Sequence, residues 1–275
     1  MRVSNLSTAP VGVETAQHFL AENFDVRQWC RRKLFPRKCG GSQAVYWNSW
    51  KSSRNRLRCG LRLPRVNLFN SLRPRLLLAK IDKQGLRDIQ KRYASSTSQY
   101  AKYSDVERWL KRNIPRIRRL GLDRSDPKEI LDLGCGGGFF LFIAKELGHS
   151  GLGLDVGNDP VCNELVDLFG VERKVWRIQA FKPLPDFGRK FDLITAFSTA
   201  FHRSADKSVA WGTDEWNFFL DDLFERQFKP RGQVFFDINS GKDKRFFPPA
   251  VRELFARRGA EIDGEFVWWK PKPVA

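Results

Sequence analysis

The chain has 275 residues, of which 41% are hydrophobic, and its 49 Lys and Arg against 31 Asp and Glu give a net charge of +18. This length suits one large α/β domain with an extension, and the apolar fraction is enough for a packed core. The excess of positive charge favours anionic partners such as nucleic acid, acidic lipid surfaces or phosphorylated substrates. No apolar run approaches the ~20 residues that span a bilayer, and residues 1–20 lack the apolar core of a secretory signal. We therefore expect a soluble protein without a membrane span.

The cysteines bear on the redox compartment and on metal binding. They are Cys30, Cys39, Cys59, Cys135 and Cys162. Their odd number and irregular spacing fit neither a disulfide framework nor a zinc site, because no C-x-x-C pair occurs. A reducing cytoplasm is the simplest location for such a chain, and no bound metal is expected.

Positive charge is concentrated in the N-terminal part. Residues 1–90 hold 18 Lys and Arg against 5 Asp and Glu, and aromatic residues such as Trp29, Tyr46 and Trp50 lie between the basic clusters. One interpretation is an arm that grips a phosphate backbone and stacks on bases. The low periodicity and high charge favour the other interpretation, a poorly ordered extension or a start upstream of a shorter natural protein. We expect residues 1–76 to be this basic extension and residues 77–275 to be the folded domain.

A helix is predicted to precede the regular part of the domain. Ser104 and Glu107 have the spacing of a capping box. A one-sided apolar stripe then begins with Val106 and Trp109. Pro115 is expected to interrupt this helix, because proline removes a backbone donor and clashes with the preceding turn.

Strands and helices alternate regularly from Glu129 onward. Short apolar runs predict strands at Glu129–Leu133, Gly151–Asp155, Lys174–Ile178, Phe191–Phe197, Gln233–Ile238, Ala260–Ile262 and Glu265–Trp269. Helical periodicity predicts a short helix between the third and fourth strands and longer helices at Phe139–Leu147, Val161–Phe169, from Thr213 onward and at Pro249–Arg258. Such alternation is typical of an α/β fold with a parallel sheet covered on both faces. The Asp263-Gly264 hairpin signal between the last two strands requires the final strand to run antiparallel.

A glycine-rich segment joins the first strand to the first helix of this series. It reads Asp132-Leu133-Gly134-Cys135-Gly136-Gly137-Gly138-Phe139. Glycines allow a sharp turn and the close approach of a ligand, and the free N–H groups of a helix N-terminus attract a carboxylate or a phosphate. Asp155 ends the adjacent strand, where a carboxylate can accept hydrogen bonds from both hydroxyls of a ribose. These features predict a site for a nucleoside that carries an anionic group.

The spacing of the glycines separates two classes of nucleotide cofactor. A dinucleotide fingerprint counted from Gly134 would need a glycine at the position of Phe139, so an NAD-dependent oxidoreductase is disfavoured. The pattern present, D-x-G-x-G-x-G, resembles that of the class I S-adenosylmethionine-dependent methyltransferases. The resemblance extends over residues 99–275, with Phe191–Ile194 as a fourth strand and Phe228–Val234 as the turn into a fifth. It implies that the folded domain is a class I methyltransferase domain with a Rossmann-like seven-stranded sheet, and that the cofactor is S-adenosyl-L-methionine.

The resemblance also implies roles for particular residues. By this resemblance, Asp132 and the backbone of Gly134, Cys135 and Gly136 would face the methionine part of the cofactor. Asp155 would hold the ribose. The family's frequent Asp after the third strand is absent here, so Gln179 and Phe181 are the candidates to contact the adenine by hydrogen bond and by stacking, unless only backbone atoms serve. The expected cofactor-binding residues are Asp132, Gly134, Cys135, Gly136, Gly138, Asp155, Val156, Gln179, Ala180, Phe181 and Phe197.

The methyl acceptor is expected beyond the end of the fourth strand. His202 in this stretch is the candidate catalytic residue, a general base, because its ordinary pKa is near neutrality. The alternative is a structural or exposed histidine. Ser204–Glu215 is either a lid over the acceptor or an ordinary loop, and Asn239 and Ser240 follow the fifth strand as further candidates for contact with the acceptor.

The acceptor class follows from what the chain lacks and from its aromatic residues. No N/D-P-P-Y/F signature for amino-group methylation follows the fourth strand, and no cysteine pair is arranged for carbon-5 chemistry on pyrimidines. The Phe- and Trp-rich segments near the expected lid favour an acceptor with an apolar part. A small-molecule, lipid or glycan-like acceptor is therefore the first hypothesis. The alternative is an RNA methyltransferase or a nucleic-acid-binding protein that uses the basic N-terminal arm.

Overall fold

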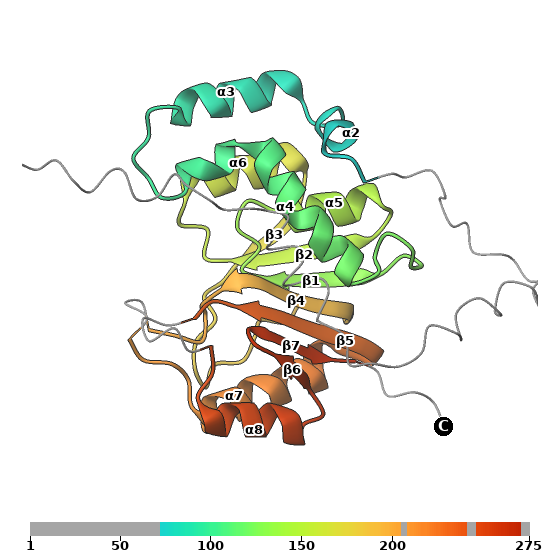
Figure 1. Ribbon diagram of the computed structural model, residues 1–275, viewed down its shortest axis with the longest axis vertical. Coiled ribbons are helices and arrows are strands. Elements are labelled where there is room, and N and C mark those ends of the chain that lie inside the picture. The colour runs from blue at the N-terminus through green and yellow to red at the C-terminus, as the bar shows by residue number, and fades with distance from the viewer. Residues whose placement is uncertain (1–71, 205–207, 241–245, 271–275) are drawn as a thin grey trace, which may run out of the picture. The chain divides into compact units, whose positions relative to one another are not determined.

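The packed domain begins before the boundary that the sequence predicts. The computed structural model describes residues 72–204, 208–240 and 246–270, and all of these belong to the second of two compact units, residues 63–275 (Figure 1). Helix α2 spans Pro74–Leu78, and both Leu72 and Leu77 are buried in the same apolar cluster as the helices that follow. The expected boundary between residues 76 and 77 therefore falls inside a packed helix. The rest of the predicted extension, with its basic and aromatic clusters, lies outside the described residues, and its role stays a prediction.

A sheet of seven strands organises the domain. Its order is β3-β2-β1-β4-β5-β7-β6, and β7 is antiparallel to both of its neighbours, whereas the pairs from β3 to β5 are parallel. The strands are β1 (Glu129–Leu133), β2 (Ser150–Asp155), β3 (Glu172–Val175), β4 (Phe191–Thr199), β5 (Phe228–Ile238), β6 (Glu261–Asp263) and β7 (Phe266–Trp269). The predicted mostly parallel sheet with an antiparallel last strand is thus confirmed.

Helices precede the sheet and connect its strands. Besides α2, the described residues form α3 (Lys83–Tyr93), α4 (Val106–Arg119), α5 (Phe139–Glu146), α6 (Pro160–Phe169), α7 (Thr213–Asp222) and α8 (Pro249–Arg257), with a 3-10 turn η2 (Ala101–Ser104) and a π-helical turn η3 (Leu223–Gln227). Helix α6 ends at Phe169 as predicted, and Gly170 closes it in the left-handed conformation. None of these described helices is both long and apolar enough to cross a membrane.

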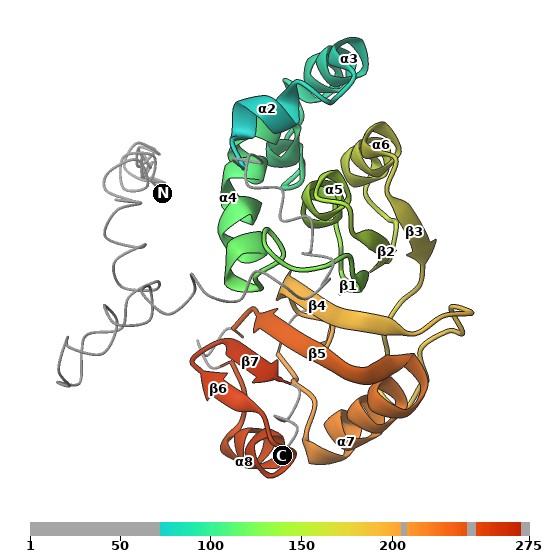
Figure 2. The same cartoon turned by 90° about the vertical axis from the view of Figure 1, so that its right-hand side faces the viewer.

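Alternate side chains of the central strands pack on opposite layers of helices. Ile130, Leu193 and Phe235 belong to an apolar cluster with α2 to α6. Leu131 and Ile194 belong to another with α7 and α8. Figure 2 shows these two groups of helices on opposite sides of the sheet. Neighbouring side chains of a strand point to opposite faces, so covering both faces requires apolar residues at consecutive positions.

Helix α4 differs from its prediction in two ways, in the residue that caps it and in its continuation through Pro115. Asp105, not Ser104, caps the helix: the carboxylate of Asp105 accepts the backbone N–H of Arg108, whereas the hydroxyl of Ser104 donates to the carbonyl of Ala101. The helix also continues through Pro115. Six residues of its inner face are buried, and their packing outweighs the roughly 3 kcal/mol that an internal proline costs.

The connection between β3 and β4 also differs from its prediction. The third strand ends at Val175, three residues before the expected end, and no helix follows it before β4. The predicted short helix is therefore wrong. Pro183 and Pro185 lie in this segment, where proline disfavours helical continuation. Leu184 is 2% exposed and packs on the α7–α8 side, so a loop covers the face that a helix was expected to cover.

The predicted turn before the fifth strand is part of the strand. Strand β5 begins at Phe228, and its pairing with β4 shifts register between residues 191 and 193 of β4. Arg231 has a φ of 67° at this irregularity. The turn-forming residues Lys229–Gly232 thus form an irregularity inside a longer strand, because a bulge can hold an extra residue without ending the strand.

Candidate functional site

The turn between β1 and α5 depends on glycine. Gly134, Gly136 and Gly138 have φ angles of 76°, 53° and 75°, a region in which other L-residues are strained. The backbone N–H of Gly134 donates to the carbonyl of Leu154 at 2.6 Å, which ties the turn to β2. A side chain on Gly136 would meet no atom within 4 Å, so the turn faces open space there. Gly138 precedes α5 without a side-chain cap, and the first N–H groups of that helix are therefore suited to a ligand.

Asp155 at the end of β2 fastens this glycine turn. Its Oδ2 accepts the backbone N–H of Gly136 at 2.9 Å, and its Oδ1 accepts that of Gly157 at 3.3 Å. A carboxylate has about four acceptor positions, so both oxygens keep capacity for further donors such as ribose hydroxyls. Val156, the next residue, is partly buried. The structure thus brings Asp155 and the glycine turn together, while their role in binding stays a prediction.

The carboxyl of Asp132 is buried behind the turn. It is 3% exposed, and its Oδ1 accepts the hydroxyl of Thr195 at 2.7 Å. Burial raises the pKa of Asp132 from 3.8 to about 7, although the Thr195 hydroxyl and the guanidinium of Arg116 act to lower it. Asp132 therefore changes its charge near neutral pH, and a cation placed beside it would favour the ionised form.

Two of the expected cofactor residues have side chains that serve the core. The Sγ of Cys135 would lie 2.5 Å from a side chain placed on Gly153, so the glycine makes room for it. Burial raises the pKa of the Cys135 thiol, which keeps it neutral and unreactive. Phe197 packs against Phe140 and Phe235, with ring centroids 4.7 and 5.8 Å away. Contact of Cys135 or Phe197 with a cofactor would thus come from the backbone.

The region after β3 is more exposed than the sequence suggests. Because the strand ends early, three expected residues lie beyond it in an exposed loop: Gln179, Ala180 and Phe181. The ring of Phe181 is 57% exposed. Val175 pairs with Asp155 in the sheet and is 60% exposed. Sequence reasoning missed Val175, since an apolar residue in a strand is expected in the core.

A strained polar turn lies where β4 ends. Ser198 has a φ of 54° at a second register shift between β4 and β5. Its carbonyl accepts the side-chain amide of Asn239, whose backbone N–H donates to the carbonyl of Thr199 at 2.9 Å. The hydroxyl of Thr199 is buried and has no hydrogen-bond partner among the described residues. Backbone strain and an unpartnered buried hydroxyl are both features of functional sites.

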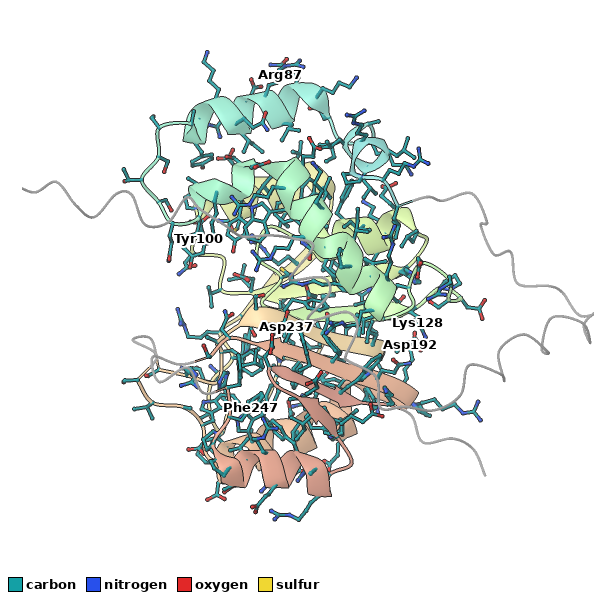
Figure 3. All side chains as sticks on the ribbon, viewed as in Figure 1. Arg87, Tyr100, Lys128, Asp192, Asp237 and Phe247 are labelled. Carbon is teal, nitrogen blue, oxygen red and sulfur yellow. The ribbon has the colours of Figure 1, made fainter. Side chains whose placement is uncertain are left out.

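Arg116 reaches this turn from α4. Its Nη2 donates to the hydroxyl of Ser198 at 2.7 Å and lies 3.3 Å from the Oδ2 of Asp237. Burial lowers the pKa of Arg116, and the carboxylate of Asp237 counteracts this effect. Figure 3 shows Asp237 well away from Lys128 and Asp192, which lie together at the opposite ends of the central strands, where β1 and β4 begin. Arg116 was not expected from the sequence, because an arginine in a helix is normally solvated.

His202 is buried among aromatic rings. It is 0% exposed, and the centroids of Trp216 and Phe247 lie 5.6 and 6.0 Å from its own. Neither ring nitrogen has a hydrogen-bond partner within the part of the chain that the structure describes. Burial, together with the charge of Arg203, lowers the pKa of His202 to about 3. Such a histidine is neutral and a weak base at physiological pH, so its role as general base stays a prediction that this geometry does not favour.

The segment expected to form a lid is only partly described. Arg203 and Ala210 form an antiparallel bridge, and Trp211 is 9% exposed. Residues 205–207 lie outside the described residues. A lid movement of this segment therefore stays a prediction.

Comparison with known proteins relates parts of the chain to methyltransferases. No protein-family model matches the chain. The chain is 29% identical over 136 residues to a ubiquinone biosynthesis O-methyltransferase from Pseudomonas fluorescens. The matched segment covers 49% of this chain and 51% of that protein. The chain is also 30% identical over 82 residues to a tRNA U34 carboxymethyltransferase from Campylobacter hominis, 28% of each chain. The chain thus spans about half, or less, of the length of these curated relatives.

A solved structure also resembles part of this chain. An O-methyltransferase family protein from Burkholderia thailandensis has a TM-score of 0.43 and 12% sequence identity. The match covers 66% of this chain and 63% of that one.

Proposed function

We propose that this chain, a member of the class I S-adenosylmethionine-dependent methyltransferase family, transfers a methyl group from S-adenosyl-L-methionine to a small-molecule, lipid or glycan-like acceptor. The observation that carries the proposal is the open glycine turn fastened by Asp155, with the buried carboxyl of Asp132 behind it. One relative that matches part of the chain bears the name of an O-methyltransferase, which supports the reaction class, and the other bears the name of a carboxymethyltransferase.

The residues around the turn fit the chemical groups of this cofactor. Asp155 retains acceptor positions for two ribose hydroxyls. Asp132 offers a carboxyl whose ionisation a nearby ammonium or sulfonium cation would favour, and the first N–H groups of α5 suit a carboxylate. The exposed side chain of Val175 beside Asp155 would give adenine an apolar contact.

The end of β4 is the part of the fold that suits the acceptor. In open α/β sheets, ligands bind beyond the carboxyl ends of the strands. The unpartnered hydroxyl of Thr199 offers a hydrogen bond there, and Arg116 with Asp237 holds the strained turn at Ser198. Phe201 adds a partly buried aromatic ring within the α7–α8 cluster. An acceptor with both a polar and an apolar part fits these surroundings.

The protein's contribution to methyl transfer is alignment and the exclusion of water. The cofactor, when bound, supplies an activated methyl group on a sulfonium centre. Asp155 and the glycine turn would fix the nucleoside, and the Ser198–Thr199 turn would fix the acceptor, so that the reacting atoms meet in line. A general base is needed only if the acceptor must lose a proton. The proposal therefore does not require His202 to move a proton.

Calorimetric titration of S-adenosyl-L-methionine into the full chain tests the cofactor. We expect micromolar binding that weakens at least ten-fold in Asp155→Ala, which corresponds to about 1.4 kcal/mol. Asp186→Ala is the matched control, because Asp186 also accepts the N–H of a glycine, Gly188, but in an exposed loop. Absence of binding by the folded chain, or equal weakening by both variants, would contradict the assignment. Binding of NAD in a parallel titration would favour an oxidoreductase.

The acceptor class needs a separate measurement. Transfer of a labelled methyl group should appear in hydroxylated aromatic compounds, lipids or glycans and not in RNA. Label found in RNA alone would contradict the proposed acceptor and favour the alternative, which the name of the tRNA-modifying relative also suggests.

A further inference from the structure

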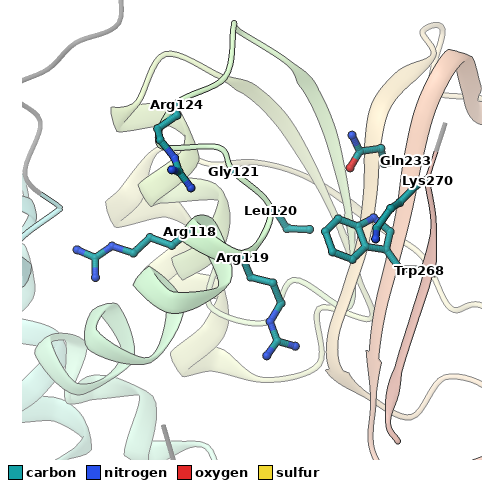
Figure 4. A pocket seen from close by; sticks show the side chains of 8 residues that line it. All are labelled: Arg118, Arg119, Leu120, Gly121, Arg124, Gln233, Trp268 and Lys270. Carbon is teal, nitrogen blue, oxygen red and sulfur yellow. The ribbon is translucent and has the colours of Figure 1, made fainter. Parts of the chain in front are cut away.

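A basic hollow lies between the end of α4 and strands β5 and β7. Its volume is about 430 Å³, and the polar and aromatic residues that line it are Arg118, Arg119, Arg124, Gln233, Trp268 and Lys270. Figure 4 shows the arginines on the side of α4 and the turn that follows it, with Trp268 on β7 opposite and Lys270 just after that strand. Among the described residues, none that lines the hollow is acidic. Its lining therefore suits an anion.

Two cations of the hollow, Lys270 and Arg124, form only exposed ion pairs. Lys270 pairs with Glu261 through side chains that are 42% and 66% exposed, and Arg124 lies 3.6 Å from Asp123 with its own side chain 75% exposed. Exposed pairs of this kind contribute little and can exchange for another anion. The indole N–H of Trp268 is buried without an acceptor among the described residues. Trp268 lines the hollow, and its indole N–H would gain a hydrogen bond from an anionic oxygen that reached it.

The positive surface continues from the hollow along the outer face of α4. Arg108, Lys111 and Arg112 are exposed, and their spacing places them on the same side of the helix as Arg118, opposite the buried stripe. Glu107 is the only acidic residue of α4, and it pairs with Lys111 at 2.6 Å. A helix of this length extends about 21 Å. The row of cations is therefore long enough to meet several charges of a polymer.

We propose that the hollow and the outer face of α4 bind the phosphate backbone of a nucleic acid strand. A basic stripe along one helix suits a polymer with regularly repeated negative charge. An acidic membrane fits less well, because none of the large hydrophobic side chains exposed in the described residues lines the hollow or lies on α4. Near the start of α4, Trp109 packs at 6.1 Å from Phe139, the first residue of α5. A strand bound along α4 would thus extend from the hollow toward the glycine turn.

This binding is a property of the folded domain. It does not depend on which acceptor is methylated, and it is distinct from the basic N-terminal arm, which lies outside the described residues. Its test must therefore keep the arm unchanged and alter only the folded surface.

Fluorescence anisotropy with a labelled single-stranded RNA of about 12 nucleotides and the full chain provides this test. The test variant is Arg118→Gln/Arg124→Gln. The matched control is Arg252→Gln/Arg257→Gln, which removes the same charge from exposed positions on α8, on the other side of the sheet. We expect the test variant to bind at least five-fold more weakly and its salt dependence to fall by about 1.4 in log–log slope. The control should stay within two-fold of the wild type.

Trp268→Phe tests the unpartnered donor separately, because it removes the indole N–H and keeps an aromatic ring. It should weaken RNA binding two- to five-fold, and thermal unfolding would check that β7 remains folded. Equal effects of the two arginine pairs, or no effect of the Arg118/Arg124 pair, would overturn the proposal. Tighter binding of polyglutamate or of phosphatidylserine vesicles than of RNA would overturn it as well.

Discussion

Replacing Asp132 by asparagine should remove a loss of stability that the wild type suffers between about pH 4 and pH 7. Burial raises the pKa of this carboxyl from 3.8 to about 7, and the difference corresponds to roughly 4 kcal/mol. Below pH 3.8 the carboxyl is protonated in both the folded and the unfolded chain. As the pH rises toward 7, the unfolded chain releases the proton and the folded chain keeps it, so the free energy of unfolding falls. Asparagine keeps an oxygen for the Thr195 hydroxyl and never ionises.

His202 contributes a pH dependence of the opposite sign. Burial lowers its pKa from 6.5 to about 3, so the unfolded chain takes up a proton that the folded chain resists. The stability associated with neutral His202 is present above pH 6.5 and is lost as the pH falls toward 3. The two effects partly cancel in the wild type. Only a comparison between variants therefore isolates the contribution of Asp132.

Urea unfolding followed by tryptophan fluorescence between pH 4.5 and 8 measures this comparison. Asp132→Asn should gain about 1.4 kcal/mol over the wild type for each pH unit up to about pH 7 and stay level above it. Asp192→Asn is the control. Partial burial raises the pKa of Asp192, but the backbone N–H of Glu129 and the ammonium of Lys229 outweigh it and hold the pKa below its usual value. Its difference from the wild type should be constant above pH 5. An equally constant difference for Asp132→Asn would refute the raised pKa.

Three further variants and conditions test the site and the fold. The affinity of the chain for S-adenosyl-L-methionine should rise with pH and level off above about pH 7. Binding at pH 6 should release protons into the buffer, and Asp132→Asn should abolish this release. Calorimetry in two buffers of different ionisation enthalpy measures the affinity and the proton release. His202→Leu should raise the free energy of unfolding at pH 7 by about 1–3 kcal/mol, because it removes two unpartnered buried nitrogens, and should leave methyl transfer intact; loss of turnover in a stable variant would instead support a general base. Pro115→Ala should stabilise the chain by about 1–3 kcal/mol in urea unfolding, since it restores a donor inside α4, and a loss of stability would show that the helix is adapted to the proline.

Local signals predicted most elements because they act within a few residues. The range of β1 was predicted without error, and Asp159 and Gly170 close the two ends of α6 within a residue of the predicted bounds. The failures arose where tertiary packing decided the outcome. Pro115 remains inside α4 because the buried face of that helix packs in the apolar cluster shared with α2 and α5. The third strand stops at Val175, and loop side chains rather than a helix cover the face beyond it.

The candidate site divides in the same way. The glycine turn is one contiguous segment, and the sequence alone placed Asp155 beside it at the end of the neighbouring strand. The other half is assembled from distant parts of the chain. Arg116 meets Ser198 across 82 positions, and the unpartnered state of the Thr199 hydroxyl depends on everything packed around it. No pattern of residue types along the chain encodes such contacts.

Asp132 and Arg116 show why the buried carboxyl matters for function. Arg116 is buried with a carboxylate partner, so its charge is compensated within the fold. Asp132 is buried with a hydroxyl as its hydrogen-bond donor, so its ionised form is compensated poorly. A neutral residue would serve stability better, and a buried group that costs stability beside an open glycine turn is a candidate for ligand binding. Asp132→Asn should therefore be the more stable protein and the weaker binder of S-adenosyl-L-methionine at pH 8. A variant that gains stability and binds as tightly as the wild type would show that the glycine turn and Asp155 define the site without this carboxyl.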